Sequence, residues 1–121
     1  MKKLIFIFSF LISIFLSAQN PNYAEDVAGI LFNSCTSCHH SGGIAPFSLM
    51  TYQEAANSVS QMVIAIIAGE MPPWPPDTNY QRYSHERILT LSDINTLLDW
   101  NNSGTPQGNM NLAPVTPNYI P

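Results

Sequence analysis

The chain has 121 residues, of which 45% are hydrophobic and 10% are charged, and its formal net charge is −4 at pH 7. Both lysines lie at the N-terminus, and beyond them two arginines face eight acidic residues, a side-chain charge of −6. Such a charge makes nucleic acid and anionic membrane surfaces poor partners, and it favours a protein partner with a basic docking face.

The first residues have the pattern of a signal peptide. Met1-Lys2-Lys3 is a basic start, and residues 4–16 (LIFIFSFLISIFL) form an uncharged apolar run. A run of this length fits the hydrophobic region of a signal peptide, about 7–15 residues, better than a membrane span of about 20. We therefore expect residues 1–18 to be removed after Ala18 and the rest to be exported, either periplasmic or secreted, with no membrane span left. An uncleaved anchor is the alternative.

Two helices are predicted in the first half of the remaining chain. Apolar residues recur at helical spacing over residues 23–33, with Asn22 as N-cap and Glu25 three residues later. A second helix follows the capping box Thr51-Tyr52-Gln53-Glu54 and ends at Gly69. The expected buried positions are Val27, Ile30, Leu31 and Ser34 in the first helix, and Val59, Met62, Val63, Ile66 and Ile67 in the second.

A third helix is predicted from its N-cap Ser92 to about residue 103, with Ile94, Leu97, Leu98 and Trp100 on or near one face. A short helical turn is expected within residues 84–89. No segment shows strand alternation, so we predict an all-α domain over residues 19–104. Residues 105–121 contain four prolines and predict a tail or linker with little attachment to the domain.

The only two cysteines stand beside a histidine in Cys35-Thr36-Ser37-Cys38-His39. In an exported protein this spacing is typical of c-type haem attachment. Thiols one helical turn apart can bond the two vinyl groups of one porphyrin, and His39 then presents its imidazole to the iron. The motif predicts one covalent haem c, attached at Cys35 and Cys38, with His39 as an axial ligand.

Three alternatives compete with haem attachment. A thioredoxin-like Cys-x-x-Cys needs a βαβ frame, and no parallel strands are predicted. A zinc site needs four ligands; His40 and His85 could join the cysteines, but no second Cys/His cluster exists, and His40 is expected to be exposed. A plain disulfide is common in a secreted chain, but it needs no histidine directly after the second cysteine.

A methionine is the expected second ligand, because a thioether in the sixth position raises the potential of a His-ligated haem. Met71 heads the loop GEMPPWPPD (residues 69–77), whose four prolines exclude helix and central strand and stiffen the chain. A pre-ordered loop lowers the entropy cost of holding a weak ligand. Met62 lies in a helical apolar stripe, Met110 in the polar tail, and Met50 close after the motif. The alternative for Met71 is ordinary packing at a helix end.

Between residues 23 and 104 the sequence resembles the monohaem cytochrome c domain of the class-I type. More closely, it is similar to the variety in exported bacterial proteins that carries CxxCH, a Gly-Gly-x-Ala-Pro-like loop and a later MPPW. The matching segments are CTSCHHSGGIAPFSLMTY, the helix that ends at Gly69, MPPW and LSDINTLLDWNNSGTP. The resemblance implies three main helices around one haem, supports Met71 as the iron ligand, and implies one-electron transfer and no enzymatic activity.

In that variety the domain is sometimes fused ahead of a type-II copper, ascorbate-dependent monooxygenase-like domain. One alternative function is therefore a redox module that serves a separate copper- or haem-dependent enzyme. Another is a haem sensor, in which a weak Met–iron bond opens for a small ligand.

Further residues are expected around the haem. A carbonyl of the extended segment Ala45-Pro46 is expected to accept the second ring N–H of His39, which orients a ligand imidazole; in class-I cytochromes the equivalent proline loop plays that part. Phe47 is expected to pack on the porphyrin, and Trp74 to donate to a propionate. The other candidates are Gly42 and Gly43 for a tight backbone beneath the ring, Ile44 and Leu49 for porphyrin contact or core, Arg82 and Arg87 for propionates, and His85 as a replacement iron ligand.

Overall fold

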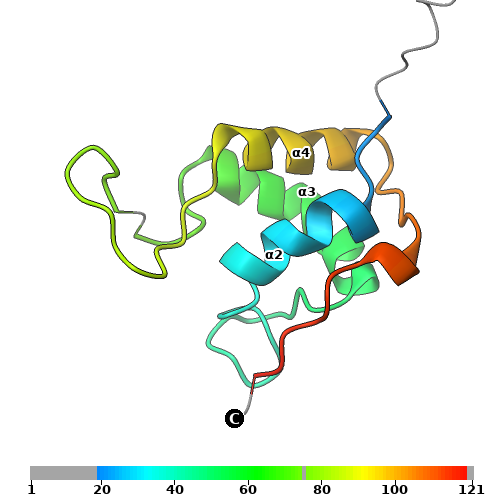
Figure 1. The fold of residues 1–121 in the computed structure, drawn as a ribbon, viewed down its shortest axis with the longest axis horizontal. Coiled ribbons are helices and arrows are strands. Elements are labelled where there is room, and N and C mark those ends of the chain that lie inside the picture. The colour runs from blue at the N-terminus through cyan, green and yellow to red at the C-terminus, as the bar shows by residue number, and fades with distance from the viewer. Residues whose placement is uncertain (1–18, 75, 120–121) are drawn as a thin grey trace, which may run out of the picture.

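The computed structural model describes residues 19–74 and 76–119, and within these ranges the protein is helical with no strand (Figure 1). The expected all-α class is thus confirmed. The expected signal peptide, residues 1–18, lies outside the described residues. None of the helices described is long and apolar enough to cross a membrane. In chain order the elements are the π-helical turn η2 (Tyr23–Val27), α2 (Ala28–Ser34), α3 (Tyr52–Ile67), α4 (Leu91–Asn102) and the 3-10 turn η3 (Met110–Leu112).

The first predicted helix forms in two parts, η2 and α2. The predicted cap is confirmed, because the backbone N–H of Glu25 donates to Asn22 Oδ1 at 3.0 Å. The first turn is wider than an α-turn, with the N–H of Val27 bonding to Asn22 O at 3.2 Å. α2 then ends at Ser34, and Cys35 is its C-cap.

The capping box of α3 is confirmed. Glu54 N donates to Thr51 Oγ1 at 3.3 Å, and Thr51 N donates to Glu54 Oε2 at 2.9 Å. Desolvation alone would raise the pKa of Glu54, but hydrogen bonds from Ser48 and Thr51 outweigh it and hold that pKa below its usual value. The helix stops before Gly69, which takes a left-handed φ of +72°.

α4 begins earlier than the sequence pattern indicated. Its N-cap is Thr90, whose Oγ1 accepts from Asp93 N at 3.1 Å, while Asp93 Oδ2 accepts from Thr90 N at 2.9 Å. The prediction of Ser92 as N-cap was wrong, because Thr90 and Asp93 form the reciprocal capping box and Ser92 lies inside the first turn of α4. The helical turn expected within residues 84–89 does not form; only a turn at Ser84 and His85 is present.

The core lies where α3 packs on α4 and η2 packs on α4. Tyr23, Leu31, Leu97 and Trp100 are almost completely buried, and Tyr23 meets the ring of Tyr52 edge-on at 5.5 Å. Full burial of each such side chain stabilises the fold by about 1.5–3 kcal/mol. The other core residues are Val27, Ala28, Leu49, Ala55, Val59, Met62, Val63 and Ile66. Ile67, expected in this face, is instead exposed, so the buried stripe of α3 ends at Ile66.

Residues 105–119 are bound to the helical body, and the expectation of a lightly attached tail was wrong for them. Pro106 O accepts from Tyr23 N at 2.9 Å and from Trp100 Nε1 at 3.0 Å, and Gln107 O accepts from Ala24 N at 3.0 Å. The first N–H groups of a helix have no acceptor within the helix, so this segment satisfies them for η2. In Figure 1 it continues from the end of α4 past α2 to the loop that follows α2.

Candidate functional site

The Cys-x-x-Cys-His motif forms a tight turn that directly continues α2. Cys35 O accepts from Cys38 N at 3.1 Å and from His39 N at 3.0 Å. Both thiols are free and half-buried. Burial, with a smaller contribution from the nearby Cys38, raises the pKa of the Cys35 thiol to about 11. The structure therefore brings the two thiols and the histidine together, as the motif predicted, and the two cysteines are not joined as a disulfide.

His39 is buried and its ring is held from one side. Its Nδ1 lies 3.1 Å from Phe47 O, and the Phe47 ring lies 4.5 Å from the imidazole. Because a carbonyl only accepts, Nδ1 carries the hydrogen in this contact, and in the neutral imidazole the lone pair is then on Nε2. The predicted acceptor in Ala45-Pro46 was wrong by one residue: Phe47 O takes this part, and Pro46 itself is exposed. An imidazole fixed in this way is an oriented ligand.

The loop after the motif folds back closely on it. Gly43 N donates to His40 O at 2.9 Å, and Ala45 N donates to Cys38 O at 3.2 Å. A Cβ at Gly43 would lie 2.3 Å from Cys38 O, so no other residue fits there without a backbone shift. Gly42 adopts a left-handed φ of +81°. The tight turn predicted from Gly42 and Gly43 is present.

Large apolar side chains are exposed on the loop after the motif and from the C-terminal end of α3 onward. Ile44 is 91% exposed and Trp74 is 93% exposed, whereas Leu49 belongs to the core. The other exposed members of this set are Phe47, Ile64, Ile67, Met71, Tyr80 and Tyr83.

Met71 follows α3 directly and is 41% exposed. Its backbone N–H donates to Ala65 O at 3.3 Å, which ties the residue to the last turn of the helix. Met62, by contrast, lies in the core as expected. The assignment of Met71 as an iron ligand stays a prediction.

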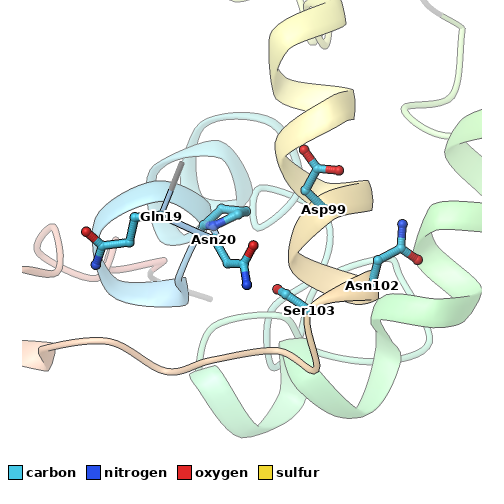
Figure 2. A pocket seen from close by; sticks show the side chains of 6 residues that line it. Gln19, Asn20, Asp99, Asn102 and Ser103 are labelled. Atoms are coloured by element: carbon cyan, nitrogen blue, oxygen red, sulfur yellow. The ribbon is translucent and has the colours of Figure 1, made fainter. Parts of the chain in front are cut away.

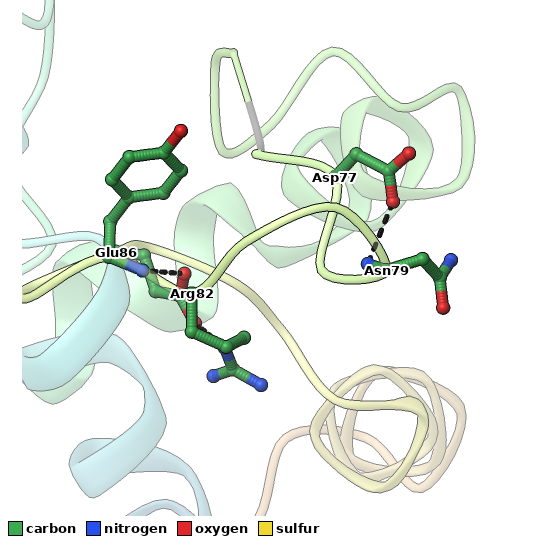
Figure 3. Close-up of polar contacts among 5 residues, drawn as sticks. Asp77, Asn79, Arg82 and Glu86 are labelled. Atoms are coloured by element: carbon green, nitrogen blue, oxygen red, sulfur yellow. Dashed lines mark hydrogen bonds and ion pairs between the residues drawn. The ribbon is translucent and has the colours of Figure 1, made fainter.

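Residues 77–89 form a surface loop with its own polar contacts (Figure 3). Asp77 Oδ1 accepts from Asn79 N at 2.9 Å, Glu86 Oε2 accepts from Tyr83 N at 2.9 Å, and Glu86 also pairs with Arg82. Arg87 Nη1 donates to Cys38 Sγ at 3.5 Å, which joins this loop to the attachment motif. The loop encloses an open hollow of about 280 Å³ lined by Pro73, Trp74, Pro76, Tyr83, His85, Glu86 and Arg87.

His40 turns away from the thiols and is half-buried, so the expectation that it is exposed was wrong. Its Nδ1 lies 2.8 Å from Thr36 O, and its ring stacks on Tyr119 with centroids 4.3 Å apart. The Tyr119 hydroxyl lies 2.9 Å from Thr36 Oγ1. No pattern in the sequence pairs Tyr119 with residue 36 or 40, because the contact joins segments about 80 positions apart.

The other site chemistries are not assembled in the part of the chain that the structure describes. Over residues 19–74 and 76–119, no three His, Cys, Asp or Glu side chains form a group that could hold a metal ion, so the zinc set of Cys35, Cys38, His40 and His85 does not come together. The same ranges contain no strand for a thioredoxin-like frame.

A second hollow, of about 310 Å³, lies between the N-terminal segment and the end of α4 (Figure 2). Its lining is a mixture of polar and apolar surface, and the one charged residue, Asp99, is exposed. It is separate from the thiols, which follow the opposite end of α2. The lining residues are Gln19, Asn20, Pro21, Asp99, Asn102 and Ser103.

Comparison of the chain with protein-family models, with curated proteins and with solved structures found no match.

Proposed function

We propose that the protein is an exported monohaem c-type cytochrome that carries single electrons and is not an enzyme. The observation that carries this proposal is the oriented imidazole of His39 next to two free thiols. Its Nδ1 is engaged by Phe47 O at 3.1 Å, so that only Nε2 is left to bind iron. A thioredoxin-like or disulfide-stapled protein has no need of such an arrangement.

The chain's residues fit a covalently held haem. Cys35 and Cys38 would hold the porphyrin through thioethers, His39 and Met71 would be the axial ligands, and the haem would supply a one-electron iron couple. Phe47 keeps the imidazole in its orientation by carbonyl and ring contact. The haem would cover exposed apolar side chains of residues 44–47 and 64–74. The fold proposed is of the class-I cytochrome c type, on the resemblance of residues 23–104.

Covalent attachment is tested by producing the full chain in cells that make c-type cytochromes. The wild type should keep its haem through a denaturing gel and show the absorption spectrum of a thioether-bound haem. Cys35→Ala and Cys38→Ala should each lose most of the retained haem, whereas Ser37→Ala, in the same turn, should keep it. Wild-type protein purified without haem from such cells would refute the proposal.

The second ligand is tested in the haem-loaded protein. Met71→Ala should keep the covalent haem but lose the weak ferric band near the red edge that is typical of sulfur–iron ligation, and its ferrous form should bind carbon monoxide readily. Met62→Leu and Met50→Leu should do neither. If the band survives in Met71→Ala and disappears in Met50→Leu, the assignment is wrong. Tight carbon monoxide binding by the wild type would favour a haem sensor over an electron carrier.

The partner is proposed to be a redox protein with a basic docking face. The side-chain charge of −6 after residue 18 would accelerate association through long-range steering. Electron-transfer rates with such a partner should fall as salt is raised, because the Debye length shrinks from about 10 Å at 0.1 M to 3 Å at 1 M. A rate that does not change with salt would show that the charge serves solubility alone.

A further inference from the structure

The two arginines of the exported chain lie in one loop, five residues apart, but in different electrostatic situations. Arg82 forms an ion pair with Glu86, whose side chain is nearly buried (Figure 3). Arg87 has no acidic group within ion-pair distance among residues 19–74 and 76–119. Its guanidinium instead donates to Cys38 Sγ at 3.5 Å. One positive charge is therefore compensated, and the other is held uncompensated against an attachment sulfur.

From this contact we propose that Arg87 is a positioning residue that fastens the loop of residues 77–89 to the attachment motif and raises the reduction potential of the haem. The inference rests on the proposed function. A sulfur accepts hydrogen bonds weakly both as a thiol and as a thioether, so the contact can persist after Cys38 is linked to the porphyrin. It also joins the loop of residues 77–89, which follows Met71, to the Cys-x-x-Cys-His turn.

The direction of the effect on the potential follows from Coulomb's law. Reduction removes one positive charge from the iron, so a fixed positive charge nearby favours the reduced form. Arg87 is exposed, and solvent weakens its effect, which should shrink further with added salt. Removing the Arg82 charge changes the net charge by the same amount, but Arg82 makes no hydrogen bond to the motif among the described residues. Arg82 is therefore a matched control within the same loop.

The experiment compares Arg87→Gln, Arg87→Lys and Arg82→Gln with the wild type by redox titration of haem-loaded protein at low and high salt. We expect Arg87→Gln to lower the equilibrium constant for reduction about threefold or more, roughly 30 mV in a one-electron couple where tenfold is ~59 mV. Arg87→Lys should restore most of the shift, and Arg82→Gln should move the potential much less. The shift in Arg87→Gln should become smaller at high salt.

A second measurement, the rate of carbon monoxide binding, tests whether Arg87 fastens the loop of residues 77–89 to the motif. Carbon monoxide should enter ferrous Arg87→Gln several-fold faster than ferrous Arg82→Gln, because the loop that follows Met71 is released at the motif. Equal potentials for Arg87→Gln and Arg82→Gln, or a potential in Arg87→Lys as low as in Arg87→Gln, would overturn the inference while the proposed function stands. Wild-type protein that acquires no haem would overturn both, and the gel assay distinguishes the two outcomes.

Discussion

Tyr119 anchors the C-terminal segment to the attachment motif, and its removal should destabilise the protein by a calculable amount. Its hydroxyl lies 2.9 Å from Thr36 Oγ1, and its ring stacks on His40. Thr36 is fully buried, but its Oγ1 also donates to Phe32 O at 3.1 Å and so keeps a partner without Tyr119. Tyr119→Phe should therefore cost about 1 kcal/mol, the net value of one hydrogen bond, and not the larger cost of an orphaned polar group.

Tyr119→Ala also removes the stack on His40, which is worth about 0.5–1.5 kcal/mol, so its total cost should be about 2 kcal/mol. The free energy of unfolding is measured by denaturant titration of the full-length protein followed by far-UV circular dichroism. Val115→Ala is the matched control in the same segment, because Val115 is 94% exposed and should change little. Equal stability of Tyr119→Ala and Val115→Ala would refute the assignment of this segment as part of the folded domain.

Three further perturbations test other parts of the structure. Thr90→Ala should destabilise the protein by about 1 kcal/mol in thermal unfolding while Ser92→Ala changes little, because Thr90 caps α4; the reverse order would restore Ser92 as the cap. Gly43→Ala should lower the free energy of unfolding by about 1–3 kcal/mol, because the added Cβ would lie 2.3 Å from Cys38 O. A Gly43→Ala protein as stable as the wild type would contradict this packing. Hydrogen bonds lower the pKa of Glu54 from its usual 4.5, so the stability that ionised Glu54 contributes is complete above that value and is lost as pH falls through the lowered pKa. Glu54→Gln should therefore weaken the fall in stability at acidic pH, measured as the free energy of unfolding against pH. An unchanged fall would exclude Glu54 as its source.

The sequence alone determined the local features of this protein. Asn22 with Glu25 and Thr51 with Glu54 are caps formed within one turn, and apolar spacing located the buried faces that include Val59 and Leu97. Such signals are readable because the interacting groups lie three or four residues apart. The start of α4 could also have been predicted from the sequence, since Thr90-Leu-Ser-Asp93 is itself a capping-box pattern. The prediction of Ser92 as N-cap overlooked this pattern.

In the candidate site, the spacing of Cys35, Cys38 and His39 indicated which groups lie together, because all three follow one another within a single turn. The sequence did not reveal that Phe47 supplies the carbonyl for His39, since the choice among neighbouring carbonyls depends on how tightly the loop closes on Cys38 O.

Only the tertiary structure decided the contacts between distant segments. Proline content suggested a free tail, yet Pro106 O satisfies the first N–H of η2 and Tyr119 reaches His40. Arg87 approaches Cys38 across 49 positions in the chain. Composition describes what a segment prefers locally. Where the segment binds depends on the unsatisfied N–H groups at the start of η2 and on the His40 ring, which lie on other parts of the chain. These contacts form only once the helices have packed, so no local sequence pattern predicts them.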